Sequence, residues 1–220
     1  MGAWSYSSIS TFKQCPKKYF HLKIAKDFKD EGGEAMQYGS DVHKAAEEYI
    51  KNGVAVPEKF SFLKPVVERL DKLPGEKETE LKMGLREDKT PCNFFASDVW
   101  WRGIADFLAL DDETGTAFSV DYKTGKNAKY ADFKQLDLVA GAIFCYFPYI
   151  KKVKSALAYV VSGDFLTKEH VVEKKGEYLG VFDNELERLA AAENSGVFNP
   201  ISGPLCAWCP VTTCEHNRKG

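Results

Sequence analysis

The hydrophobic residues change their spacing after Pro74-Gly75, and this change restricts the fold more than any other feature of the sequence. Before it, apolar residues such as Val42, Ala45 and Ala46 recur at helical intervals. After it, apolar and polar residues alternate, as in strands with one buried face. The pattern predicts helices over about 7–22, 40–51, 62–73, 132–147 and 184–193, and strands over about 78–85, 99–110, 117–123, 156–162 and 169–173. This order predicts an α/β (α+β) domain with a mixed central sheet flanked by helices.

Charge and hydrophobicity exclude several classes of protein. The 220 residues carry 30 Lys and Arg against 32 Asp and Glu, a net charge of −2, which argues against a histone-like polycation and an acidic disordered tail. The longest apolar run, 139–147, is far shorter than the about 18 residues that a membrane-spanning helix needs. The first residues also lack the basic start and apolar stretch of a signal peptide. We therefore expect a cytoplasmic protein without a membrane partner.

The cysteines indicate a metal centre. In a cytosolic chain, the spacing Cys206-x2-Cys209-x4-Cys214 favours metal binding over a disulfide, because one short loop can bring three thiolates together. A fourth ligand is needed, and the sequence offers two. His216 would complete a local Cys3His zinc site, whereas Cys15 would tie the beginning of the chain to its end.

Two carboxylates and a lysine are predicted to lie together on adjacent strands. The segment 111–115 is a turn signal, so a hairpin that turns near residue 113 sets Asp106 opposite about residue 120. Alternation then places Asp121 and Lys123 on one face. Adjacent carboxylates repel unless one keeps its proton or a cation lies between them, and Mg²⁺ suits such a pair. The pattern is coherent for phosphodiester hydrolysis, although alternating Asp and Lys on a strand is more often a solvated face.

Further segments resemble one nuclease superfamily. In chain order they are Ser5-Tyr6-Ser7-Ser8, Cys15-Pro16-Lys17-Lys18-Tyr19-Phe20, Tyr38-Gly39-Ser40-Asp41-Val42-His43, Arg102-Gly103-Ile104-Ala105-Asp106, Val120-Asp121-Tyr122-Lys123-Thr124-Gly125 and Gln135-Leu136. Together with the cysteines they resemble the RecB-like nucleases of the PD-(D/E)xK superfamily, in particular the CRISPR-associated iron–sulfur exonucleases and the AddB nuclease domain. The resemblance spans residues 5–214.

The resemblance implies a restriction-endonuclease-like fold and a set of site residues. Asp106 and Asp121 would hold Mg²⁺ or Mn²⁺, with His43 and the Tyr122 carbonyl as further ligands. Lys123 would be the catalytic lysine, and Gln135 would position that lysine or the DNA backbone. One departure concerns the family's Gln-x-x-x-Tyr motif, because Val139 stands where the tyrosine is expected.

The resemblance also implies that Cys15, Cys206, Cys209 and Cys214 hold a [4Fe–4S] cluster in a C-terminal cysteine-rich flap, which favours Cys15 over His216, with Zn²⁺ as the less expected occupant. The chain would form a single nuclease domain over 1–220, in which a helical segment 1–30 and the segment 198–220 jointly bind the cluster. Beyond the motifs, Lys126, Lys129 and Lys134 are placed to meet a DNA backbone. Glu80 could be a further acidic residue near the metals, but a solvated side chain is the preferred expectation.

The expected function is a metal-dependent deoxyribonuclease, an exonuclease more than an endonuclease, with DNA as its partner. Two alternatives stay open: a non-catalytic DNA-end-binding or adaptor subunit of a recombination or CRISPR-adaptation complex, and a zinc-bound nucleic-acid-binding protein. The sequence predicts neither the polarity of digestion nor the oligomeric state.

Overall fold

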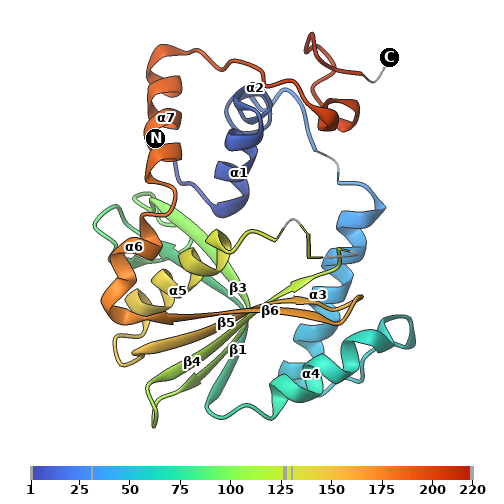
Figure 1. The fold of residues 1–220 in the computed structure, drawn as a ribbon, viewed down its shortest axis with the longest axis vertical. Helices are drawn as coiled ribbons and strands as arrows, with labels where there is room; N and C mark the ends of the chain where they lie inside the picture. The colour runs from blue at the N-terminus through green and yellow to red at the C-terminus, as the bar shows by residue number, and fades with distance from the viewer. Residues whose placement is uncertain (1, 31, 126–127, 130, 219–220) are drawn as a thin grey trace. The chain divides into compact units, whose positions relative to one another are not determined.

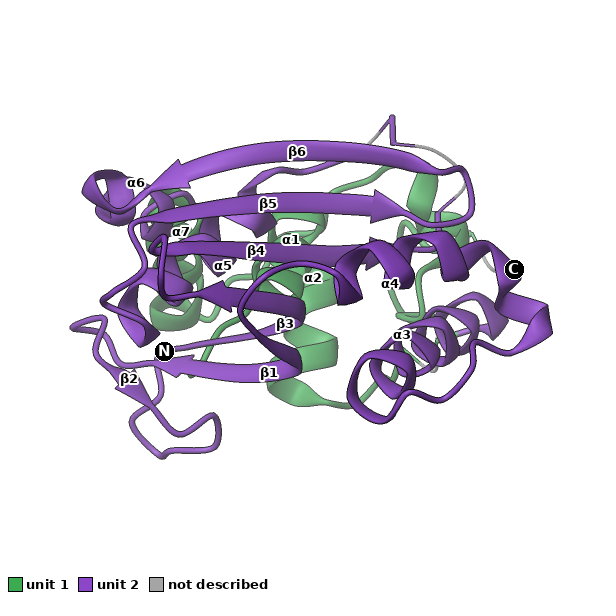
Figure 2. Ribbon diagram, turned by 90° about the horizontal axis from the view of Figure 1, so that it is seen from below, with its two compact units in different colours: residues 1–32, 182–220 green, residues 33–181 purple. Residues whose placement is uncertain are grey.

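The computed structural model describes residues 2–30, 32–125, 128–129 and 131–218. The chain divides into two compact units (Figure 2). Unit 1 combines Met1–Gly32 with Phe182–Gly220, and unit 2 is Gly33–Val181. Unit 1 therefore joins two segments that are far apart in the sequence.

Unit 2 is built on a mixed sheet of six strands in the order β2-β1-β3-β4-β5-β6 (Figures 1 and 2). The strands are β1 (Glu76–Leu85), β2 (Pro91–Cys92), β3 (Trp101–Asp111), β4 (Thr116–Lys123), β5 (Lys152–Tyr159) and β6 (Asp164–Val171). All pairs are antiparallel except β4 and β5. Parallel neighbours need a crossover, which helix α5 (Lys134–Tyr146) supplies. The predicted α/β class with a mixed sheet is confirmed.

The β3–β4 hairpin has the predicted register. Leu110 pairs with Ala117 and Phe107 with Val120, so the next position sets Asp106 opposite Asp121. The turn is closed by Asp111, whose carboxylate accepts hydrogen bonds from the Thr114 hydroxyl at 2.6 Å and the Thr114 N–H at 3.4 Å. The turn chemistry thus fixes which strand residues face one another.

Helices cover both faces of the sheet. One face packs against α3 (Glu34–Asn52), the 3₁₀ helix η2 (Glu58–Leu63) and α4 (Lys64–Asp71), in a core that includes Phe107, Val120 and Ala156. On the other face Leu136 of α5 packs against Leu157 and Tyr159 of β5. The alternation of Ala156 and Leu157 between the two cores is the period of two that the sequence shows. Short segments η3 (Val172–Lys174) and α6 (Lys175–Leu179) end the unit.

Helix α3 differs from its predicted extent at one end. It ends at Asn52 as expected, because Gly53 takes the left-handed conformation (φ 64°) that caps helices without a Cβ clash. It begins at Glu34, six residues before the predicted start at 40. The extra turns carry mostly exposed side chains, so the sequence shows no apolar periodicity there.

Unit 1 contains α1 (Tyr6–Gln14), α2 (Pro16–Tyr19), the π-helix η1 (Phe20–Ala25), α7 (Asp183–Ser195) and the 3₁₀ helix η4 (Pro204–Trp208). The helix predicted over 7–22 is wrong in one respect, because Cys15 interrupts it in an extended conformation (φ −162°, ψ 109°). The proline ring at position 16 disfavours helical geometry in the residue before it. Aromatic contacts join the two segments, as between Trp4 and Phe182, with ring centroids 6.2 Å apart.

Within the described residues, every helix is too short or too polar to cross a lipid bilayer.

Candidate active site

The candidate site collects side chains from five elements of unit 2. Glu80 lies on β1, Asp106 on β3, and Asp121, Tyr122 and Lys123 at the end of β4. His43 comes from α3 on one face of the sheet, and Gln135 comes from the first turn of α5 on the other. The predicted site residues are therefore gathered where these strands and helices meet.

Strand β1 is distorted at the site. The β1–β3 ladder pairs Thr79 with Phe107 and Leu81 with Ala105 but leaves Glu80 and Asp106 unpaired between them. Glu80 has φ 51°, a left-handed conformation that costs about 1–2 kcal/mol for a residue with a Cβ. On the other side of β3, Asp106 Oδ2 accepts the N–H of Tyr122 on β4 at 2.9 Å. Backbone strain of this kind is held in place by the surrounding fold and is frequent at functional sites.

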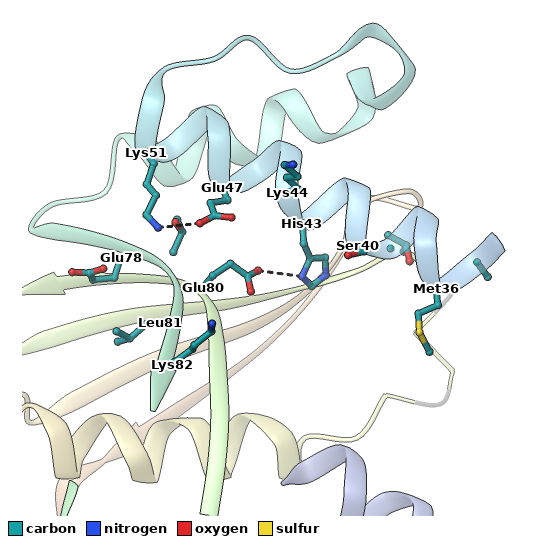
Figure 3. Close-up of a pocket in the computed structure, with 14 residues that line it drawn as sticks. Met36, Ser40, His43, Lys44, Glu47, Lys51, Glu78, Glu80, Leu81 and Lys82 are labelled. Atoms are coloured by element: carbon teal, nitrogen blue, oxygen red, sulfur yellow. Dashed lines mark hydrogen bonds and ion pairs between the residues drawn. The ribbon is translucent and has the colours of Figure 1, made fainter. Parts of the chain in front are cut away.

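Three side chains here could bind one metal ion. His43, Glu80 and Asp106 each offer a ligand atom, and these atoms lie within 4.8 Å of one another. His43 Nε2 donates to the Tyr122 carbonyl at 3.0 Å, so Nδ1 is the nitrogen that a metal would contact once the ring has lost its second proton. Nδ1 lies 3.4 Å from Asp106 Oδ2 and 3.6 Å from Glu80 Oε1, and Figure 3 shows Glu80 pointing from β1 toward His43.

The shifted pKa values show that negative charge is concentrated in this group, which favours binding of a cation. Burial and, after it, the negative charge of Asp121 raise the pKa of Asp106 to about 7. Burial by itself lowers the pKa of His43, but Glu80 and then Asp106 outweigh it and raise the pKa to about 9. Both groups thus hold protons that a divalent ion would displace, and a carboxylate-rich set with one imidazole fits Mg²⁺ or Mn²⁺.

Glu80 was considered from the sequence as a further acidic residue near the metals, but a solvated side chain was the preferred expectation. Its side chain is 33% exposed and belongs to the potential metal group. A glutamate on an alternating strand has no local signal for this role. The signal that exists is positional, because the strand pairs on either side, Thr79–Phe107 and Leu81–Ala105, place residue 80 across from residue 106.

Asp121 lies next to the lysine rather than within the group of three. Lys123 Nζ is 2.7 Å from Asp121 Oδ2 and donates to Gln135 Oε1 at 2.8 Å. Gln135 Nε2 also donates to Asp121 Oδ1. The amide therefore holds both the ammonium and the carboxylate in place.

A wide cleft opens beside the site. Its volume is about 1050 Å³, and α3 and β1 supply nearly all of its walls. His43 and Glu80 line it together with Lys44 and Lys82 (Figure 3). Of the lysines predicted to meet DNA, Lys126 lies outside the described residues. Lys134 Nζ donates to the Val181 carbonyl at 2.8 Å.

The predicted cluster residues gather in unit 1. A cavity of about 190 Å³ is lined by all four predicted cysteines and by His216: Cys15, Cys206, Cys209, Cys214 and His216. Cys15 Sγ accepts hydrogen bonds from the N–H groups of Ile201 at 3.4 Å and Lys18 at 3.5 Å. Gly203 N–H donates to Cys206 Sγ at 3.4 Å. Nearby, Lys17 and Glu215 form an ion pair at 2.5 Å that joins the two chain segments.

Comparison with known proteins assigns the family. A family model described as the PD-(D/E)XK nuclease superfamily matches residues 3–214. A solved structure of a proposed exonuclease from Eubacterium rectale is similar, with a TM-score of 0.55, 16% identity, and coverage of 98% of this chain and 88% of that chain. A second, called SSO0001, has a TM-score of 0.48 and 14% identity, and the match covers 99% of this chain and 87% of that one. The curated proteins contain no match.

Proposed function

The chain belongs to the PD-(D/E)XK nuclease superfamily, and on this premise we propose that it is a Mg²⁺- or Mn²⁺-dependent deoxyribonuclease that acts as an exonuclease. The family and the restriction-endonuclease-like mixed sheet make it a nuclease fold. The observation that carries the catalytic proposal is the position of Lys123, held by Asp121 and Gln135 next to the group of His43, Glu80 and Asp106.

Each residue has a role that its contacts support. His43 Nδ1 and the carboxylates of Glu80 and Asp106 would hold the ion, and Asp121 adds negative charge beside them. The bound ion would lower the pKa of a water molecule and polarise the scissile phosphate. Lys123 would stabilise the negative charge that develops on the phosphate oxygens. Gln135 is a positioning residue, because it contacts Lys123 and Asp121 rather than the reacting atoms.

The Tyr122 carbonyl was predicted as a further metal ligand. It accepts the hydrogen bond from His43 Nε2, and a carbonyl oxygen has a second lone pair for an ion. We therefore keep Tyr122 in the proposed ligand set, with the additional role of fixing the ring orientation of His43. Such contacts from outside the ligand set orient the ligands of most metal sites.

The cysteine cavity supports the second part of the proposal, a [4Fe–4S] cluster bound by Cys15, Cys206, Cys209 and Cys214. Convergence of the four thiols on one cavity fits such a ligand set, and N–H donors to Cys15 and Cys206 are the kind that tune cluster sulfurs. His216 lines the same cavity, so Zn²⁺ is the alternative. Anaerobically purified protein should be brown if the cluster is present and colourless if zinc is bound.

The DNA substrate and the cytoplasmic location belong to the same proposal. All six cysteines are free thiols in the structure, which suits a reducing compartment. The chain shares its fold with the proposed exonuclease from Eubacterium rectale, and exonuclease action is the part of our proposal that follows the name of that protein.

The proposal is tested by digestion of end-labelled linear DNA and closed circular DNA with Mn²⁺. We expect the linear DNA to shorten from its ends and the circle to stay intact. Lys123→Ala should reduce the rate by about 100-fold or more, because a positioned charge on the transition state is lost. Lys77→Ala, a lysine of β1 outside the cleft, is the matched control and should cleave normally.

Two results would contradict the proposal. If Lys123→Ala cleaves DNA at the normal rate, Lys123 has no catalytic role. If the closed circular DNA is cleaved, the enzyme acts as an endonuclease rather than as an exonuclease. If the wild type binds DNA ends but leaves all substrates intact with Mn²⁺, the adaptor alternative replaces the enzyme.

A further inference from the structure

The loop 86–100 between β1 and β3 carries two adjacent aromatic rings, of which Phe95 is exposed and Phe94 is half-buried. Phe95 is 72% exposed, although burial of a phenylalanine side chain stabilises a fold by about 1.5–3 kcal/mol. Its ring lies edge-on to Phe94, with centroids 5.0 Å apart. The Phe94 contact therefore supports a Phe95 side chain that is largely exposed to solvent.

Two cations flank these rings. Arg102 Cζ lies 5.6 Å from the centre of the Phe94 ring and 5.9 Å from that of Phe95, and Lys82 Nζ lies 5.9 Å from the Phe95 centre. We call Lys82, Phe94, Phe95 and Arg102 the aromatic platform.

Neither cation is neutralised by an acid. Within the described part of the chain, Lys82 and Arg102 form no ion pair with a carboxylate. Arg102 Nε is also buried without a hydrogen-bond partner there. Asp98, an acid of the same loop, is paired with Arg86 at 2.6 Å. Within the described residues, the platform therefore combines a largely exposed aromatic ring with two cations that no carboxylate pairs with, which fits an anion that carries a flat ring.

The platform adjoins the active-site cleft. Lys82 lines the cleft together with Glu80 (Figure 3). The two residues are two positions apart on β1, about 7 Å along the strand. The β1–β3 register sets Gly84 opposite Arg102, so the second cation continues the same row away from Glu80. A chain that reaches the metal group along this row would pass the aromatic platform.

We propose that the aromatic platform binds an unpaired nucleotide of the substrate strand, with its base stacked on Phe95 and its phosphates near Lys82 and Arg102. The inference rests on the proposed function, because the cleft must be where the strand is cleaved. Bases of a single strand have free faces for stacking, whereas those of a duplex are already stacked on their neighbours. The platform thus selects single-stranded DNA, or the frayed end of a duplex.

Fluorescence anisotropy without added metal tests the platform, because binding is then measured without cleavage. The probes are a labelled single-stranded oligonucleotide and a blunt duplex of the same sequence. Phe95→Ala should raise the Kd for the single strand by about tenfold or more, as expected for a lost base–aromatic stack. Phe95→Trp keeps an aromatic face and should bind within a few fold of the wild type. Phe165→Ala, which removes an exposed aromatic from β6, is the matched control and should bind normally.

The outcomes separate the platform from the proposed function. Unchanged single-strand binding by Phe95→Ala would overturn the inference and leave the platform as a surface for a protein partner. Equal losses for single strand and duplex would overturn the selection of unpaired bases. Hydrolysis of the p-nitrophenyl ester of thymidine 5′-monophosphate by the wild type with Mn²⁺ tests the chemistry by itself. Loss of binding in Phe95→Ala with an inactive wild type would support the platform while refuting the nuclease.

Discussion

The acidic site of unit 2 and the cysteine site of unit 1 are assembled by different means. His43, Asp106 and Lys123 project from long helices and strands, and hydrogen bonds to the Tyr122 backbone and to Gln135 hold them. The cysteines lie at a helix break, on the five-residue helix η4 and in the loop after it. The comparison indicates that the sheet forms the first site by folding, whereas short segments from two distant parts of the chain form the second. We propose that a bound ligand stabilises this second arrangement.

The largest expected effect concerns Asp106→Asn. We expect cleavage to fall by at least about 100-fold, as when a charged group of an active site is removed. The thermal midpoint should not fall, because the variant removes a buried carboxyl whose pKa is already raised toward 7 and keeps an oxygen for the Tyr122 N–H. Cleavage of end-labelled DNA and thermal unfolding measure both. A large drop in the midpoint would show that the acid supports the fold, contrary to the comparison.

Cys209→Ser should lower the thermal midpoint, in contrast to Asp106→Asn. A ligand that is bound only by the folded chain, at a hundred times its Kd, contributes about 2.7 kcal/mol. In a protein of this size such a loss lowers the thermal midpoint by roughly 5–10 °C. The visible absorption of the cluster should disappear as well. Cys92→Ser, a cysteine outside the cavity, should retain both, and a stable, colourless Cys209→Ser protein would contradict a structural role for the ligand.

The affinity of the acidic site for Mn²⁺ should depend on pH. In the metal-free protein Asp106 has a pKa of about 7 and His43 of about 9, so binding must displace protons below these values. Between pH 7 and 9 the affinity should rise by about tenfold per pH unit as His43 loses its proton, and more steeply below pH 7. Calorimetric titration with Mn²⁺ at several pH values measures this affinity. His43→Gln should flatten the slope above pH 7, and a flat profile for the wild type would exclude these residues as ligands.

The smallest effect concerns the backbone at Glu80. Both Glu80→Ala and Glu80→Gly remove the carboxylate and should cleave poorly. Glu80→Gly should be more stable than Glu80→Ala by about 1 kcal/mol, because glycine adopts a positive φ without a Cβ clash. Glu78 lies on the regular part of the same strand, so Glu78→Gly should be less stable than Glu78→Ala. Denaturant unfolding of these four variants measures both differences. The same order of stability at both positions would refute backbone strain at Glu80.

Local patterns predicted the β3–β4 hairpin well and the ends of other elements unevenly. Helices α5 and α7 lie within two residues of their predicted bounds, whereas β5 begins at Lys152 and β6 at Asp164 rather than at 156 and 169. The turn at 111–115 gave the hairpin register, and alternation gave the faces of Asp121 and Lys123. The break at Cys15 follows from Pro16 and could have been read from the sequence. The start of α3 at Glu34 has no apolar signal. Strand β2, two residues long, is defined by its pairing with β1 rather than by its own composition.

The site was predictable only where strand geometry or a resemblance fixed a residue. Asp106, Asp121 and Lys123 follow from the hairpin, and His43 and Gln135 come from the resemblance. The place of Glu80 depends on a positive φ that no rule for glutamate predicts, because tertiary packing imposes it. Whether these residues act as proposed is what the variants above test.

The composition of unit 1 has a consequence for biosynthesis. Its first segment ends at Gly32 and its second begins at Phe182, so a ribosome makes the whole of unit 2 before the partner of the first helices exists. At about 5–20 residues per second, Cys15 waits roughly 10–40 s for the other three thiols. If the proposed cluster is bound, its insertion is therefore a late event, and a stalled or truncated chain would carry Cys15 without the other three proposed ligands.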